Sequence, residues 1–269
     1  MEFKLPQRFN ESNKGTYGKV LNIAGSKYMR GAAYLSSAAA LTIGCGYVVL
    51  CSDEAVLDTV SVLLPEAVLS PITNLEKDIK EADVISLGCG LSTDNLAINI
   101  FNRVMKISPN IPVIIDADGL NILAQTKVKK LPEELILTPH PIEAARLLHT
   151  TPDTVLGDTK RSAAMITEKY NCTTVLKSHN TVVCSKNLEL YEHKAGNSAL
   201  AKAGSGDVLC GIIAGLLAQK MTPFDATTLG VYLHGLSGRV ASKNLTEYSV
   251  LASELITHIP AALKLFLKS

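Results

Sequence analysis

A single acidic residue stands between a glycine-rich turn and a long apolar run in AKAGSGDVLCGIIAGLLAQ. Gly204, Ser205 and Gly206 precede the acid, Asp207, and the pattern after it predicts a helix. Backbone N–H groups at the start of a helix have no intrahelical partner and attract phosphate. A carboxylate at the same helix end can accept the proton of a substrate hydroxyl that attacks phosphorus. Capping by Asp207 would explain the acid but not the glycines, so we predict an anion hole at Gly204, Ser205 and Gly206 and a catalytic Asp207.

A lysine closes an apolar, strand-like run elsewhere in the chain. TVLK ends at Lys177, and the polar residues 178–181, SHNT, predict a hairpin turn before a second apolar run. An ammonium at this strand end can reach a phosphate group. A solvated surface lysine is the structural alternative.

Two further strand ends carry polar side chains. In LTPHPIEAARLL, proline and glutamate occupy positions typical of a first helical turn, which places His140 at the helix cap. Because a helix amino terminus opposes positive charge, we expect a neutral His140 that hydrogen-bonds a ligand, or one that only caps the helix. In IIDADG, Asp116 and Asp118 suit either helix capping or a water-mediated contact with magnesium, with capping favoured for at least one of them.

Small residues mark two other loops. Gly88 and Gly90 flank a strand end in SLGCG, and Gly31 and Ala32 begin a helix in RGAAYL. Such residues let a ligand approach the backbone, although ordinary turns and tight helix packing are structural alternatives. The chain has neither the GxGxxG dinucleotide loop nor the GxxxxGK[ST] phosphate loop.

These residues need a scaffold that places strand ends side by side. Short continuous apolar runs, typical of strands covered on both faces, alternate with longer helical patterns. We expect strands at 20–25, 48–50, 84–88, 113–116, 135–138 and 174–177 and helices at 31–43, 95–106, 142–148 and 154–169, with helical segments after residue 190 that start near Asp207, Pro223 and Ser249. The prediction is a single α/β domain over residues 1–269, a three-layer α/β/α sandwich with a mostly parallel central sheet. Ligands in such sheets bind beyond the carboxyl ends of the strands.

Charge and composition exclude several classes of partner. The 26 basic and 25 acidic residues leave a net charge of +1 without long runs of one sign, so we expect binding to neither nucleic acid nor an anionic membrane. The amino terminus has no apolar core, and the longest apolar run, residues 208–218, is too short to cross a bilayer. We expect a soluble cytoplasmic protein.

The cysteines point to the same compartment. The six cysteines form no CxxC pair and lie mostly inside apolar segments, which favours buried, reduced thiols. We therefore expect no zinc site, and the spacing identifies no protein ligands for any other metal.

Several motifs in order give the chain a family resemblance. GSGD with its apolar helix resembles the anion-hole signature of the ribokinase-like superfamily. Together with NKGTYGKVLNIAGS, RGAAYL, DADGLNIL, LTPHPIEAARLL and VYLHGLSG, it is similar to the ADP- or ATP-dependent NAD(P)H-hydrate dehydratases over most of the chain, from Asn13 to the last helix.

This resemblance implies a metabolite-repair reaction. A nucleotide would phosphorylate the ring hydroxyl of hydrated NADH or NADPH with magnesium assisting, and elimination of phosphate would return the usable coenzyme. By position, Asp207 matches the acid/base that also contacts the substrate, and Gly206 matches the nucleotide-phosphate contact. The positions that match nucleotide contacts are Lys177, Ser178, His179, Asn180 and Thr181, and those that match contacts to the hydrated coenzyme are Ala32, Gly90 and His140.

The chain departs from the family pattern in three places. Ser178 and His179 occupy a turn that often begins with glycine. Cys89 stands where the family usually has proline, and Cys210 where it often has threonine. The epimerase domain fused to some relatives is absent from the pattern, so an epimerase is expected to be a separate partner. The family tendency to form homo-oligomers extends to this chain only as an expectation.

Two other functions fit the same residues. A ribokinase-like kinase acting on a hydroxyethylthiazole or hydroxymethylpyrimidine alcohol would use Asp207 and its glycine turn equally well. A non-enzymatic nucleotide-binding sensor could have kept the fold, although the intact GSGD motif argues against it. The sequence leaves open whether ATP or ADP is the donor and whether hydrated NADH or hydrated NADPH is preferred.

Overall fold

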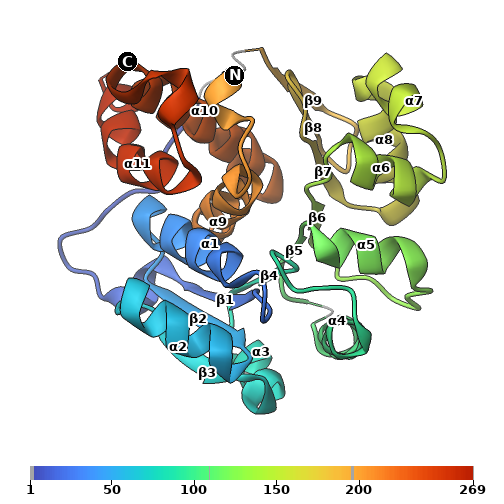
Figure 1. Cartoon of the computed structure of the whole chain (residues 1–269), viewed down its shortest axis with the longest axis horizontal. Helices are drawn as coiled ribbons and strands as arrows, with labels where there is room; N and C mark the ends of the chain where they lie inside the picture. Colours follow the sequence, from blue (N-terminus) through green and yellow to red (C-terminus); the bar gives the residue numbers. More distant parts are fainter. Residues whose placement is uncertain (1–2, 109, 195–196, 269) are drawn as a thin grey trace.

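A nine-stranded sheet forms the centre of the computed structural model, which describes residues 3–108, 110–194 and 197–268 (Figure 1). Across the sheet the strands lie in the order β3, β2, β1, β4, β5, β6, β7, β8, β9. Their bounds are β1 (Lys19–Ile23), β2 (Tyr47–Ser52), β3 (Val68–Pro71), β4 (Val84–Leu87), β5 (Val113–Ile115), β6 (Leu135–Leu137), β7 (Thr173–Leu176), β8 (Thr181–Cys184) and β9 (Leu190–His193). Neighbouring strands from β3 to β7 pair in parallel. Strand β8 pairs antiparallel with β7, and β9 pairs antiparallel with β8. The carboxyl ends of seven strands therefore meet at one edge.

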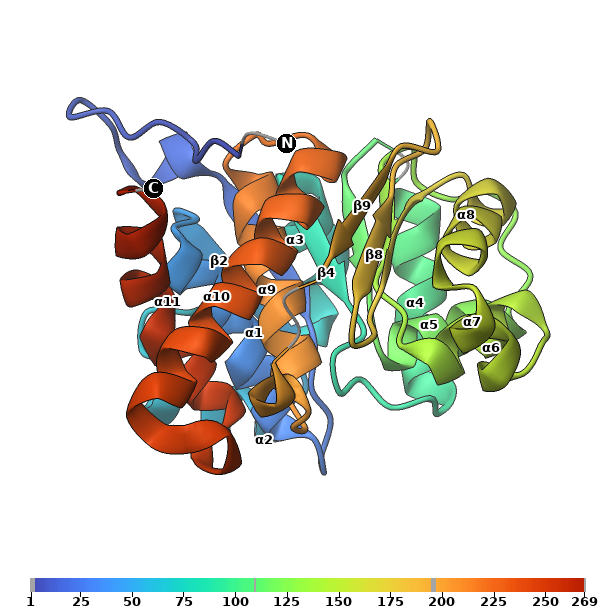
Figure 2. The ribbon, with the colours of Figure 1, turned by 90° about the horizontal axis from the view of Figure 1, so that it is seen from above.

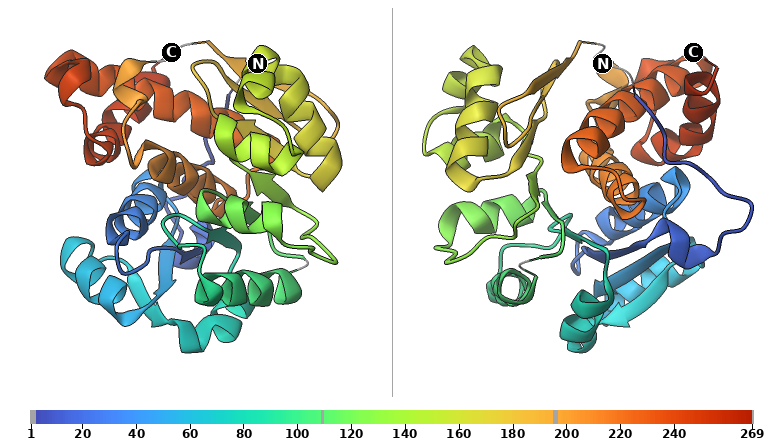
Figure 3. Two further views of the ribbon diagram at one scale, coloured as in Figure 1. Left: turned by 45° about the vertical axis from the view of Figure 1, so that its right-hand side comes forward. Right: turned by 180° about the vertical axis from the view of Figure 1, so that it is seen from behind.

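Helices cover both faces of this sheet (Figures 2 and 3). Consecutive strand residues alternate between two cores, as Val20 and Leu21 of β1 do, because successive side chains point to opposite faces. The first core is covered by α1 (Arg30–Ile43), α2 (Glu54–Leu63), α9 (Ser205–Ala218), α10 (Pro223–Ser249) and α11 (Ala252–Phe266). The second is covered by α3 (Leu75–Glu81), α4 (Asn95–Ile107), α5 (Asp118–Gln125), α6 (Pro141–Leu148), α7 (Pro152–Gly157) and α8 (Thr159–Tyr170). The predicted three-layer α/β/α sandwich is confirmed.

Some boundaries differ from the sequence prediction. The helix expected at 154–169 is two helices, because Asp158 leaves the helical conformation and its carboxylate accepts the Arg161 N–H at the start of α8. Helix α9 begins at Ser205 rather than Asp207. The chain after Leu190 first forms β9, and β3 was not predicted. Both strands lie at sheet edges and are only partly buried, so they lack the apolar runs that mark the central strands.

No helix among the residues that the structure describes is both long enough and apolar enough to span a membrane. The long apolar run of the sequence is α9, which is buried against α1, α10 and the sheet. The apolar side chains of α9 therefore form part of the protein core.

The turn after β4 requires glycine at one position. Gly88 has a φ of 120°, and a Cβ there would lie 2.2 Å from the carbonyl oxygen of Asp116 and 2.5 Å from the amide nitrogen of Gly119. We expect Gly88→Ala to lower the free energy of unfolding by about 3 kcal/mol, or roughly 10 °C in Tm, from backbone strain and overpacking. Gly157→Ala is the control, because a Cβ at Gly157 meets no atom within 4 Å. Equal melting temperatures for the two variants would contradict this account.

Candidate active site

The predicted anion hole lies at the first turn of α9. Gly204 adopts the left-handed conformation, with a φ of 87°, and Ser205 then starts the helix. The Ser205 hydroxyl lies 3.2 Å from Nε2 of His234 on α10. Burial lowers the pKa of His234 to about 4, so this histidine is neutral at physiological pH. His234, a buried residue of α10, thus ties the predicted anion hole to the neighbouring helix.

An ion pair between a partly buried lysine and a buried aspartate faces this helix start. The ammonium of Lys177, after β7, lies 2.5 Å from Oδ1 of Asp116, after β5. Burial alone would lower the pKa of Lys177, but the carboxylates of Asp116 and Glu143 outweigh it and raise that pKa above its ordinary value. A Cβ at Gly206 would lie 3.4 Å from the Lys177 nitrogen. A charged ammonium therefore stands beside the start of α9, an arrangement that suits a phosphate group. The Ser205 N–H itself donates to the carbonyl of Lys202 at 3.2 Å, so it is not free for a ligand.

Asp207 is the third residue of α9 and is partly buried at the same place. Burial, followed by repulsion from Asp116, raises its pKa to about 6, while a hydrogen bond from the Cys89 thiol and the charge of Lys177 act in the opposite direction. A carboxylate that titrates close to neutral pH is a stronger base than an ordinary aspartate. The electrostatics of Asp207 thus suit proton acceptance.

His140 caps α6 at the adjacent strand end. Its Nδ1 accepts the N–H groups of Ile142 and Glu143, and the Glu143 carboxylate accepts the N–H of His140 in return. The backbone of Lys177 donates to the carbonyl of Pro139, which holds this loop against β7. Burial, and then Lys177, lowers the pKa of His140, in agreement with the neutral histidine that the sequence predicts.

The loop after β4, which contains Gly90, lies against the start of α1, which contains Ala32. Gly90 has a φ of 62°, and a Cβ there would lie 2.7 Å from the Cβ of Ala32. Close packing thus accounts for the glycine, and a role in ligand binding stays a prediction. A cavity of about 320 Å³ opens at this end of the sheet and is lined by residues that include Gly25, Ser52 and Ser92.

The predicted nucleotide turn is ordered by its own side chains. The Ser178 hydroxyl donates to the carbonyl of Asn180 at 2.7 Å, and the Thr181 hydroxyl donates to the carbonyl of Ser178 at 3.2 Å. His179 is exposed at the tip. The turn follows Lys177 directly. If Lys177 binds a phosphate of the nucleotide, the remainder of the nucleotide would lie beside this turn.

Neither Asp116 nor Asp118 caps α5, so the capping predicted for at least one of them is wrong. Ala117 is the N-cap and forms no side-chain cap hydrogen bond. Asp118 instead accepts the N–H of Ser92 at 2.9 Å, which joins two loops of the site. The Lys177–Asp116 pair was missed because no spacing rule connects residues on different strands, although both stand directly after strands of the predicted sheet.

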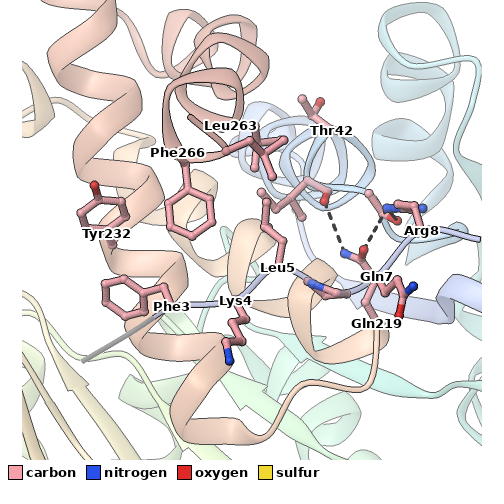
Figure 4. Close-up of a pocket in the computed structure, with 14 residues that line it drawn as sticks. Phe3, Lys4, Leu5, Gln7, Arg8, Thr42, Gln219, Tyr232, Leu263 and Phe266 are labelled. Carbon is pink, nitrogen blue, oxygen red and sulfur yellow. Dashed lines mark hydrogen bonds between the residues drawn. The ribbon is translucent and has the colours of Figure 1, made fainter. Parts of the chain in front are cut away.

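A larger cavity lies elsewhere, between the N-terminal segment and α1, α10 and α11 (Figure 4). It measures about 1170 Å³, and Phe3, Tyr232 and Phe266 line its aromatic side. Arg8 on its rim donates to Gln219 at 2.8 Å. This cavity contains none of the predicted site residues.

The fold and the arrangement of the site are those of a ribokinase-like α/β enzyme. The family model described as NAD(P)H-hydrate dehydratase matches residues 20–261. The ADP-dependent (S)-NAD(P)H-hydrate dehydratase of Neisseria meningitidis serogroup B is 39% identical over 242 residues, which cover 88% of this chain and 81% of that protein. The chain belongs to the NAD(P)H-hydrate dehydratase family.

Two further relatives extend the comparison. The structure of the ADP/ATP-dependent NAD(P)H-hydrate dehydratase from Bacillus subtilis, co-crystallised with ATP and Mg²⁺, superposes with a TM-score of 0.89 at 32% identity and covers 97% of this chain and 94% of its own. The bifunctional NAD(P)H-hydrate repair enzyme of Moorella thermoacetica is 34% identical over 97% of this chain. The chain spans about half of that bifunctional protein, 52% of its length.

Proposed function

We propose that the protein converts hydrated NADH or NADPH back to the usable coenzyme, with ADP or ATP as the phosphate donor. One arrangement carries the proposal: Asp207 and the free N–H groups of α9 stand beside the charged Lys177 at the carboxyl ends of the parallel strands. The names of the family and of the close relatives support the substrate. They do not favour the vitamin-precursor kinase or the sensor.

We assign a task to each group. The backbone N–H of Gly206 and the side-chain ammonium of Lys177 hold the transferred phosphate. The turn that contacts the nucleotide consists of Ser178, His179, Asn180 and Thr181. Asp207 accepts the proton of the ring hydroxyl as that oxygen bonds to phosphorus and the nucleotide leaves. The ring carbon–oxygen bond then breaks with loss of a proton from the neighbouring carbon, which releases phosphate and restores the ring double bond. Ala32, Gly90 and His140 position the hydrated ring.

Magnesium fits this site through oxygen ligands. Oδ2 of Asp116 lies on the side of Gly206, 3.9 Å from a Cβ built at that glycine, while Oδ1 pairs with Lys177. Mg²⁺ keeps several of its waters and prefers carboxylate and phosphate oxygens. We propose that the nucleotide phosphates hold the ion and that Asp116 contacts it through water. The ion would neutralise charge on the phosphates during transfer.

We also propose a domain organisation, an assembly and a location for the enzyme. Residues 1–269 would act as one catalytic domain that assembles into homo-oligomers, with an NAD(P)H-hydrate epimerase as pathway partner. All six cysteines are free thiols, which supports a reducing compartment such as the cytoplasm.

The test is an absorbance assay of purified protein with hydrated NADH, Mg²⁺ and either ATP or ADP. We expect the near-ultraviolet band of dihydronicotinamide to return only when nucleotide is present. Comparing the two nucleotides, and then hydrated NADPH, identifies the donor and the preferred coenzyme. Accumulation of a stable phosphorylated product would instead support the small-alcohol kinase.

Gly206→Ala is expected to separate nucleotide binding from stability. The added Cβ would stand 3.4 Å from the Lys177 ammonium, in the space we assign to phosphate. We expect the nucleotide KM to rise about tenfold, equivalent to the loss of one charge-assisted hydrogen bond, while Tm stays equal or rises because alanine favours the helix. Steady-state kinetics and thermal unfolding measure the two effects, and a fall in Tm without a change in KM would argue against a phosphate site here.

A further inference from the structure

Two cysteines and an aspartate from separate elements converge beneath the proposed active site. Cys89 follows β4, Asp116 follows β5 and Cys210 lies on α9. Each residue is at most 1% exposed, and the two Sγ atoms and a carboxylate oxygen all lie within 4.8 Å of one another. Neither thiol has a task in the proposed reaction.

The topology explains this convergence. Strands β4 and β5 are parallel neighbours, so the residues after them emerge together, and the Asp116 N–H donates to the carbonyl of Leu87 at 3.1 Å. Helix α9 packs over β4, where Cys210 Sγ lies 3.4 Å from the hydroxyl of Ser86. The three ligand atoms are therefore held by the sheet and its covering helix.

The spacing is close to that of a coordinated metal ion. Zinc binds thiolates at about 2.3 Å and carboxylate oxygens at about 2.0–2.2 Å, so ligand atoms of a tetrahedral site lie roughly 3.5–3.8 Å apart. The cluster would need to contract by about 1.3 Å at most to reach this geometry.

We propose that Cys89, Cys210 and Asp116 form a binding site for a soft divalent cation such as Zn²⁺ or Cd²⁺. Binding replaces the two thiol protons with one dication and forms two metal–sulfur bonds without transfer of electrons. The net charge of the buried cluster is unchanged, which avoids the large penalty of adding charge to a protein interior. Thiolate ligands select such ions over Mg²⁺.

Occupancy of this site would block the proposed reaction. A cation bound to Asp116 takes up the counter-ion of Lys177, the ammonium that we assign to the transferred phosphate. Inhibition by soft cations rests on the proposed function, whereas the existence of the site does not.

Cadmium alone is the probe for the site. Titration of the purified protein with Cd²⁺ is expected to produce the ultraviolet absorbance of cadmium–thiolate bonds, saturating at one ion per chain with two protons released. The single variants Cys210→Thr and Cys89→Ala should each lose about half of the absorbance band. Each should also weaken Cd²⁺ binding by at least about 100-fold, because loss of a residue that only supports a metal ligand costs up to about 100-fold and loss of a ligand costs more. The double variant should have no band.

Matched controls separate this site from other thiols. Cys172 is likewise fully buried, but it packs in the second core, so Cys172→Ala should leave the titration unchanged. Excess Mg²⁺ should not remove the band. A band that persists in the double variant, or the absence of a band in the wild-type protein, would overturn the proposal.

The activity assay is evaluated separately. Nucleotide-dependent turnover that is lost as the cadmium band saturates supports the inhibitory role, and turnover that continues at saturation contradicts it. If the wild-type protein has no dehydratase activity, the proposed function fails while the spectroscopic titration still decides the site.

Discussion

Replacement of Asp207 by asparagine is expected to lower turnover of the hydrated coenzyme by about 10²–10⁴-fold, the usual contribution of a general base. The amide has the same shape as the carboxylate but cannot accept the hydroxyl proton. Nucleotide affinity should change little, because the N–H groups of α9 and the Lys177 ammonium remain. The absorbance assay measures turnover, and calorimetric titration measures nucleotide binding.

Stability distinguishes this catalytic effect from unfolding. Burial raises the pKa of Asp207, which means that the folded protein disfavours its charged form, so Asp207→Asn should be no less stable than the wild type. Asp153→Asn is a matched control, because Asp153 is an exposed acid in the first turn of α7. Retention of most of the turnover in Asp207→Asn would exclude this residue as the proton acceptor.

Lys177→Met is expected to have a double effect. Removing the ammonium leaves the buried Asp116 carboxylate unpaired, and breaking one side of a buried ion pair lowers the free energy of unfolding by about 3–5 kcal/mol. Tm should fall by roughly 10 °C. The nucleotide KM should rise by about 10–100-fold, because a charged donor to phosphate is lost.

A double variant separates the two consequences. In Lys177→Met/Asp116→Asn no charge remains unpaired at this pair, so most of the lost stability should return, while the nucleotide KM stays high. Thermal unfolding and steady-state kinetics on the wild type, both single variants and the double variant complete the cycle. If nucleotide binding recovers together with stability, Lys177 is a structural residue and not a phosphate ligand.

The amino-acid sequence by itself determined the layered α/β fold and the local parts of the site. Continuous apolar runs identified the central strands, and the glycines beside Asp207 indicated the start of α9, because both signals depend on residues adjacent in the chain. The histidine cap was also visible, since proline and glutamate mark a first helical turn.

Only the tertiary structure decided which of these parts face one another. Three pairs of residues lie close together although their strands and helices are far apart in sequence: Lys177 with Asp116, His234 with Ser205, and Cys89 with Cys210. The edge strands β3 and β9 were likewise unpredicted, because pairing with a neighbour stabilises them without a long apolar run. Strand order and helix packing set these distances, and neither is encoded in local spacing. The charge of Lys177 and the basicity of Asp207 follow from burial and neighbouring charges, which exist only once the sheet and its covering helices have packed.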